Sequence, residues 1–175
     1  EIDWIRIDDE AQYEKVLTYD VSTLEPQLSC PQGVDNVYPI SEVLGTPMDE
    51  VYIGSCTNGS LEDLKAAADI LRGKKVANHV RVIVVPATNT VFKEAIEKGY
   101  IKDFIEAGCV ISHPCCGLCC GMPYGLMYDD ERILLTANRN FIGRQGTKKT
   151  LGYLSSPAVA AATALTGVVT DPRTL

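Results

Sequence analysis

The stretch VYIGSCTNGSLEDLKAAADILRGK, residues 51–74, joins an apolar run to a helical pattern through a short polar turn. The run VYIGSC is typical of a buried strand. Ser60 stands where the N-cap of a helix is expected. Apolar residues then recur at the three- and four-residue spacing of one helix face: Leu61, Leu64, Ala67, Ala68 and Leu71. This stretch therefore predicts a strand followed by an amphipathic helix.

The same alternation of strand and helix continues toward the C-terminus. The expected elements are strands at 80–87, 109–114 and 133–138 and helices over 88–108 and 156–167. The last helix begins with Pro157 after Ser156, a favoured helix start. Because strands alternate with helices, we expect an α/β fold: a mainly parallel sheet with right-handed crossovers and helices on both faces, three layers in the order α/β/α.

The N-terminal quarter has a different pattern. Residues 15–22, KVLTYDVS, alternate apolar and polar residues like an exposed strand, and residues 24–39 are rich in Pro and Asn, which indicates an ordered linker. The first residues carry no Met and no signal-peptide pattern, so we expect a cut or processed end. We therefore interpret residues 1–47 as an arm or linker and residues 48–175 as the α/β domain.

Composition excludes several classes of protein. The net charge of −7 argues against a nucleic-acid partner, since phosphate binding needs clustered Lys and Arg. No apolar run approaches the roughly 20 residues that span a bilayer, so we expect no membrane insertion. The seven cysteines are odd in number and clustered, unlike a secreted disulfide framework. A reducing, cytoplasmic location is therefore expected.

Chemically distinctive side chains follow the expected strands. In parallel sheets, ligands gather at the carboxyl ends of the strands, where the loops meet. Three loops lie there: GSCTNG with Cys56, HPCCGLCCGM with its four cysteines, and NRNFIGRQG with Arg139 and Arg144. We therefore expect these three loops to come together.

Cys116 and Cys119 form a Cys-x-x-Cys pair, and the spacing alone leaves three alternatives open. They are a thioredoxin-like redox pair, half of a zinc site, and part of an iron–sulfur site. The pair lies in a loop late in the sheet, which argues against the redox motif, and no second Cys-x-x-Cys is available for structural zinc. Together with Cys56 the pair would supply three thiolates, leaving a metal centre one ligand short, as in catalytic sites.

Four ordered motifs carry a resemblance to a known family: VYIGSCTNGSLEDL, CCGLCCGM, TANRNFIGRQG and YLSSPAVAAATALTG. The sequence resembles the aconitase superfamily of hydro-lyases, and within it the third domain of large subunits of the isopropylmalate dehydratase and homoaconitase type. The segment LEPQLSCPQGVDNVYPISEV is similar to the stretch that leads into that domain, so the resemblance covers nearly the whole chain.

The resemblance implies a cofactor. Cys56, Cys116 and Cys119 match the three thiolate ligands of a four-iron, four-sulfur (4Fe-4S) cluster whose fourth iron lacks a protein ligand. In such enzymes that iron is a Lewis acid for a hydroxy di- or tricarboxylic acid such as isopropylmalate or homocitrate, which is dehydrated and rehydrated.

The resemblance also implies substrate contacts and missing parts. Arg139 and Arg144 match the arginines that bind substrate carboxylates, which suits the guanidinium fork, and Asn138 matches a residue beside the cluster. No catalytic base is expected in this chain. It would come from a small subunit or swivelling domain, and upstream domains would complete the large subunit, so the chain alone is expected to be incomplete and inactive.

Each assignment has a plainer alternative. Cys56 could be a buried small apolar residue, and Arg139 and Arg144 could be loop charges paired with acidic residues at 129–131. The whole chain could instead be a zinc-binding structural or interaction domain, or a thiol redox protein that uses Cys116 and Cys119. Structural roles are expected for three further candidates: Cys30, Cys109 and His113.

Two thiols depart from the family pattern. Cys115 stands where relatives often have a small residue, and Cys120 where they usually have an aliphatic one. Pairing of Cys115 with Cys119, or of Cys116 with Cys120, is therefore conceivable. We expect Cys116 and Cys119 to be the ligands.

Overall fold

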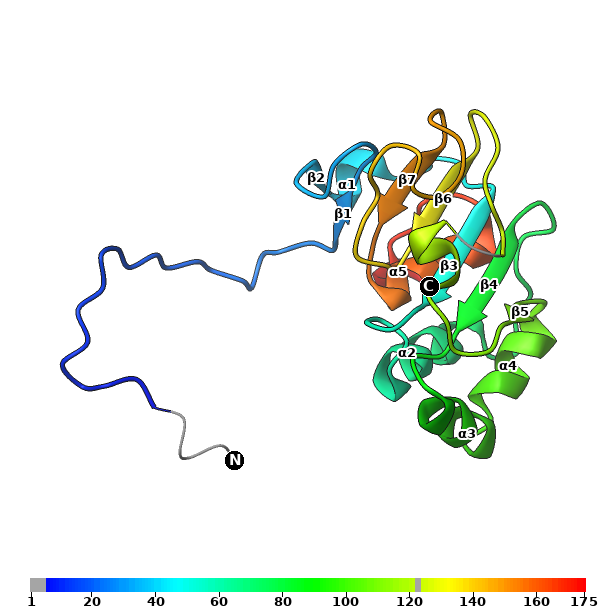
Figure 1. The fold of residues 1–175 in the computed structure, drawn as a ribbon, viewed down its shortest axis with the longest axis horizontal. Helices are drawn as coiled ribbons and strands as arrows, with labels where there is room; N and C mark the ends of the chain where they lie inside the picture. The colour runs from blue at the N-terminus through cyan, green and yellow to red at the C-terminus, as the bar shows by residue number, and fades with distance from the viewer. Residues whose placement is uncertain (1–5, 122–123) are drawn as a thin grey trace.

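The computed structural model describes residues 6–121 and 124–175, and Figure 1 shows how its helices and strands are arranged. The strands are β1 (Gln27–Ser29), β2 (Val37–Pro39), β3 (Glu50–Gly54), β4 (Arg81–Val85), β5 (Val110–Ile111), β6 (Arg132–Leu135) and β7 (Leu151–Leu154). The helices are α1 (Ile40–Val43), α2 (Leu61–Leu71), α3 (Asn89–Glu97), α4 (Tyr100–Ala107) and α5 (Pro157–Thr166), with 3-10 helices η1 (Gly117–Cys120) and η2 (Pro172–Thr174).

The strands form one seven-stranded sheet in the order β2-β1-β7-β6-β3-β4-β5. The five strands from β7 to β5 pair in parallel, whereas β1 pairs antiparallel with both β2 and β7. The predicted α/β class and the mainly parallel sheet are therefore confirmed. Strand β7 was not among the expected strands, because it is short and carries Gly152, a residue that weakens the strand pattern.

Two apolar clusters lie on opposite faces of the sheet. Val51 and Ile53 of β3 belong to the larger cluster, which packs against the α-helices. Tyr52, between them, belongs to the second cluster, which also contains Leu118 and Cys119 of η1 and Met127. Among the described residues, η1 is thus the helical element of that second layer. No helix of this part of the chain has the length and apolar composition needed to cross a membrane.

Local signals at the helix ends explain where the helices begin. Ser60 accepts a hydrogen bond from the Asp63 backbone, and the Asp63 carboxylate accepts one from the Ser60 backbone, a reciprocal capping box. The helix predicted over 88–108 is divided into α3 and α4 because Gly99, with φ of 82°, adopts the left-handed conformation between them.

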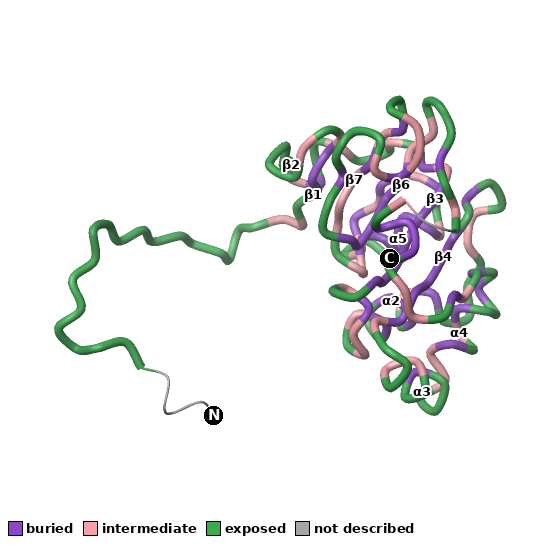
Figure 2. The backbone as a smooth tube through the Cα atoms, in the orientation of Figure 1, coloured by how far each residue is buried: buried purple, intermediate pink, exposed green. Residues whose placement is uncertain are grey.

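The N-terminal arm has two parts in the structure. Residues 6–23 form neither helix nor strand and are exposed, and they run away from the rest of the molecule in Figures 1 and 2. The strand predicted at 15–22 is wrong, because the described residues offer this segment no neighbouring strand with which to pair. Residues 27–39 instead join the edge of the sheet as β1 and β2. The boundary at residue 47 stays a prediction.

A buried carboxylate lies at the start of β3. Glu50 is fully buried, and its Oε2 accepts a hydrogen bond of 2.8 Å from Nε of Arg81. Its Oε1 is buried and has no hydrogen-bond partner among the described residues. Burial raises the pKa of Glu50 from its ordinary 4.5 to about 7, although Arg81 opposes that rise.

This raised pKa predicts that stability falls as the pH rises. Between pH 4.5 and about 7 the folded state keeps the proton of Glu50 while the unfolded state releases it. The contribution that this group makes to the free energy of unfolding below pH 4.5 is therefore lost as the pH rises through this range. The loss is at most about 3 kcal/mol of unfolding free energy. Glu50→Gln should remove this pH dependence, measured by urea unfolding of the full-length polypeptide between pH 5 and 8.

The exposed Glu94→Gln is the matched control for this change. It removes the same charge without removing a buried carboxylate, so its pH dependence should follow that of the wild type. An equal fall of stability with pH in the wild type and in Glu50→Gln would contradict the prediction.

Candidate functional site

The loop after β3 is hydrogen-bonded to the end of β6. The backbone N–H of Gly54 donates to Oγ1 of Thr136 at 2.7 Å, and the Asn58 amide donates to the Thr136 carbonyl. Oγ1 of Thr57 donates to Oδ1 of Asn138 at 3.1 Å. These bonds hold the cysteine that follows β3 beside the loop that carries the arginines, as expected from the parallel order of the two strands.

The turn after β3 depends on glycine. At Gly54, with φ of 109°, a Cβ atom would lie 1.9 Å from the Val85 carbonyl oxygen. At Gly59 it would lie 2.6 Å from the carbonyl oxygens of Ser55 and Val85. The backbones therefore approach too closely for any side chain at these two positions. Cys56, which lies between them, is exposed at the surface. The alternative that Cys56 is a buried apolar residue is wrong.

The cysteine loop rests on Tyr52. The Tyr52 hydroxyl donates to the Cys116 carbonyl oxygen at 3.1 Å, and burial, followed by the nearby cysteines, raises the pKa of Tyr52, so the hydroxyl remains a donor at neutral pH. Leu118 and Cys119 are buried in the cluster that contains Tyr52. Cys116 and Cys120 are exposed at the two ends of the same helical turn.

The thiols of the two loops lie within electrostatic reach of one another. The pKa of Cys116 is raised, first by the thiolate of Cys120 and then by that of Cys56, with smaller contributions from burial and Cys119. In residues 6–121 and 124–175, no three Cys, His, Asp or Glu side chains are close enough to hold one metal ion. Thiolates are ligands of both zinc and iron–sulfur sites, so the chemistry of this donor set fits either group.

All seven cysteines are free thiols. Cys30 and Cys109 are buried, and burial raises the pKa of Cys109 to about 12, as for an inert core thiol.

The other two thiols of the cysteine loop have polar neighbours. Cys115 is partly buried with its sulfur 3.8 Å from Oγ of Ser112, while the Cys120 sulfur lies 3.5 Å from the Gly117 carbonyl oxygen. His113 makes an edge-to-face ring contact with Tyr124.

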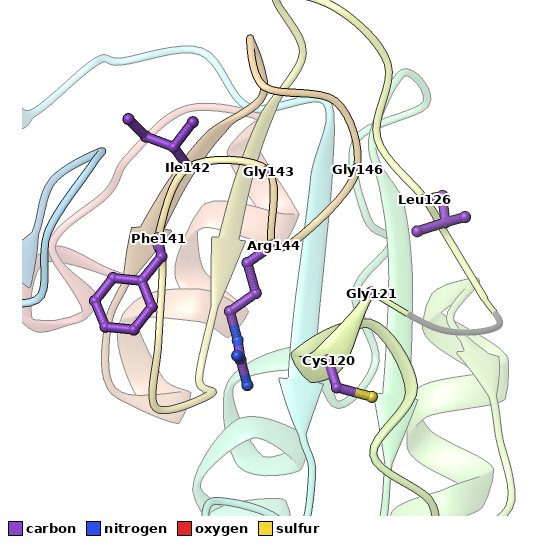
Figure 3. Close-up of a pocket in the computed structure, with 8 residues that line it drawn as sticks. All are labelled: Cys120, Gly121, Leu126, Phe141, Ile142, Gly143, Arg144 and Gly146. Atoms are coloured by element: carbon purple, nitrogen blue, oxygen red, sulfur yellow. The ribbon is translucent and has the colours of Figure 1, made fainter.

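Arg144 lies in an open pocket beside the cysteine loop. The pocket has a volume of about 400 Å³, and Figure 3 shows its lining residues: Cys120, Gly121, Leu126, Phe141, Ile142, Gly143, Arg144 and Gly146. The loops are in close contact, since a Cβ atom at Gly121 would lie 2.7 Å from the Arg144 carbonyl oxygen. Nε of Arg144 is buried and has no hydrogen-bond partner among the described residues, so this guanidinium retains donor capacity.

Two of the three acidic residues proposed as partners of the arginines pair with other cations. Asp129 pairs with Lys149 at 2.9 Å, and Glu131 pairs with Arg81 at 3.4 Å. Over the described ranges, neither Arg139 nor Arg144 forms an ion pair with an acidic side chain. The alternative that both are paired loop charges is therefore wrong.

The structure places Arg139 differently from Arg144. Arg139 is exposed, does not line the pocket, and donates from Nη1 to the Asn138 carbonyl at 2.7 Å. Asn138 itself contacts Thr57 of the first loop. Arg139 and Asn138 thus lie near the Cys56 loop, whereas Arg144 lies beside the Cys116 loop.

Two residues that build the site were not singled out in the sequence. Tyr52 supports the cysteine loop, and an aromatic residue between Val51 and Ile53 was the available signal. Asn140 is buried, and its amide donates to Oγ of Ser29 and to the carbonyls of Cys30 and Gly152. These bonds anchor the arginine loop to β1 and β7. No periodicity marks Asn140, because its partners are far away in the chain.

Comparisons with known proteins agree with this arrangement. Residues 42–167 match the aconitase family (aconitate hydratase). The chain is 50% identical over 166 residues to a probable 3-isopropylmalate dehydratase large subunit of Methanosarcina mazei, covering 95% of this chain and 40% of that protein. It is 51% identical over 169 residues to 3-isopropylmalate dehydratase large subunit 1 of Archaeoglobus fulgidus, covering 97% of this chain and 40% of that protein. The corresponding protein of Geobacter metallireducens is 52% identical over 168 residues, covering 96% and 39%.

The chain thus spans about 40% of the length of the curated relatives it matches. The matched family region includes all three loops of the candidate site. On this evidence, the chain belongs to the aconitase family.

Proposed function

We propose that this chain is the cluster-bearing part of an iron–sulfur hydro-lyase that dehydrates and rehydrates a hydroxy di- or tricarboxylic acid such as isopropylmalate or homocitrate. The observation that carries the proposal is the meeting of the Cys56 loop, the Cys116 loop and Arg144 at the carboxyl ends of the parallel strands. The names of the relatives, 3-isopropylmalate dehydratase large subunits, favour isopropylmalate among these acids.

Cys56, Cys116 and Cys119 would hold a 4Fe-4S cluster with one iron free of protein ligands. When bound, the cluster supplies a Lewis acid for the substrate hydroxyl and carboxylate. This chain's own residues hold the thiolates in place and bind substrate. Arg144, which lines the open pocket, would bind a carboxylate through its guanidinium fork.

Arg139 and Asn138 would extend the substrate site on the side of the Cys56 loop. The exposed guanidinium of Arg139 has no acidic partner in the described part of the chain and is available for a second carboxylate. Oδ1 of Asn138 accepts from Thr57, which holds its amide beside Cys56. The substrate would therefore lie between the two loops.

The remaining parts of the enzyme would lie outside these 175 residues. A chain with about 40% of the length of its relatives needs further large-subunit domains, and the words large subunit in their names imply a small subunit. We assign the catalytic base to that partner rather than to this chain. Seven free thiols suit a reducing compartment, so we place the enzyme in the cytoplasm.

Reconstitution tests the proposal. The full-length polypeptide, incubated without oxygen with ferrous iron, sulfide and a thiol reductant, should turn brown, absorb broadly in the visible range and bind about four irons. Metal analysis and the visible spectrum measure this outcome. A colourless protein that binds zinc would favour the structural zinc domain, and rapid dithiol exchange without iron uptake would favour the redox protein.

A further inference from the structure

Tyr52 contacts all three parts of the candidate site. It lies in β3, four residues before Cys56, so it belongs to the strand that places this cysteine. Its backbone carbonyl accepts a 3.0 Å hydrogen bond from Thr136 N–H, at the start of the arginine loop. Its hydroxyl donates to the Cys116 carbonyl at 3.1 Å, across 64 residues of sequence.

The hydroxyl also limits how closely the cysteine loop can approach the sheet. Gly117 has φ of 50°, and a Cβ atom there would lie 2.5 Å from the Tyr52 oxygen. The ring carbons of Tyr52 would be farther away, at 3.4 and 3.5 Å, which is ordinary contact. Tyr52 is fully buried, so its hydroxyl is shielded from bulk solvent. The Cys116–Gly117 backbone therefore rests directly on this oxygen.

We propose that Tyr52 is a positioning residue whose hydroxyl fixes the Cys116–Cys119 turn relative to Cys56. The inference rests on the proposed function, because the consequence of this placement is the strength with which the three thiols retain the cluster. The Tyr52 hydroxyl bonds to backbone and not to a sulfur atom. It acts through the Cys116 backbone, which carries one ligand and leads into η1 with the other.

The first test removes the hydroxyl alone. Tyr52→Phe in the reconstituted full-length polypeptide should lose iron in air about fivefold faster than the wild type, the factor that corresponds to one buried hydrogen bond. Tyr153→Phe on β7 is the matched control, since it removes a partly buried hydroxyl away from the cysteine loop. Unchanged iron loss in Tyr52→Phe, with a normal loading of iron, would overturn the inference.

The second test needs no cluster. Gly117→Ala should lower the melting temperature of the metal-free polypeptide more than Gly73→Ala does, because Gly73 has a similar φ of 71° but no neighbour within 4 Å. In the Tyr52→Phe background, Gly117→Ala should lower the melting temperature by no more than Gly73→Ala does. Additive melting shifts would overturn the inference.

The two tests separate the inference from the proposed function. A wild-type polypeptide that takes up no iron would contradict the proposed function, while the melting experiment would still decide whether the Tyr52 hydroxyl supports the turn. Full iron uptake with additive melting shifts and normal retention in Tyr52→Phe would contradict the inference alone.

Discussion

The Cys56→Ser, Cys116→Ser and Cys119→Ser variants are each expected to lose the cluster, with iron falling to near the background of the assay. Serine does not ionise at neutral pH, so it cannot replace a thiolate ligand. The measurement is the iron and sulfide content of the full-length polypeptide after anaerobic reconstitution. Cys56 and Cys116 are exposed, so their substitution tests the ligand role with little effect on the core.

The neighbouring thiols are matched controls for this prediction. Cys115→Ser and Cys120→Ser should retain iron, because Cys115 contacts Ser112 and Cys120 contacts the Gly117 carbonyl. Full iron content in Cys56→Ser would contradict the assignment of that residue. Iron loss in Cys120→Ser together with retention in Cys119→Ser would move the ligand role from Cys119 to Cys120.

Arg144→Lys is expected to lower kcat/KM about a hundredfold, a loss of roughly 2 to 3 kcal/mol of transition-state stabilisation. Lysine keeps the positive charge but loses the planar fork that binds a carboxylate through two hydrogen bonds. The open pocket and the unpartnered Nε leave the guanidinium available for such a ligand. Steady-state kinetics of the enzyme reconstituted with its cluster and partner subunit measure the effect.

Arg139→Lys should lower kcat/KM as well, because that side chain also lacks an acidic partner in the described ranges. The matched control is Arg173→Lys, since Arg173 is paired with Asp171 at 2.6 Å and lies outside the three loops. The control should show near-normal turnover. Normal turnover in both Arg139→Lys and Arg144→Lys would remove the substrate role and leave the cysteine assignment.

Much of the fold could be predicted because its determinants are local. The apolar run at 51–54 and the Ser60 capping box are encoded within a few residues of the elements that they specify. The strand β7 was not predictable in this way. Gly152 is explained by close packing, since a Cβ atom there would lie 3.0 Å from Oε1 of Gln145. That requirement is tertiary and leaves no periodic signal.

The candidate site was predictable as a set of loops but not as a set of side-chain positions. Parallel strands end at the same edge of a sheet, which brings the three loops together. The exposure of Cys56, however, depends on the turn at Ser55, a non-glycine residue with φ of 100°. The difference between Arg139 and Arg144 likewise depends on the path of one irregular loop.

The cover of the second sheet face has a thermodynamic consequence. Leu118 and Cys119 are adjacent residues, and the first is buried in the core of that face while the second is a proposed ligand. Any group bound by the Cys119 sulfur therefore contributes its binding free energy to the closure of this core, by linkage. Loss of that group would weaken amide protection and protease resistance here first. Hydrogen exchange at the residues around Leu118 would therefore measure how much of the chain holds its cofactor.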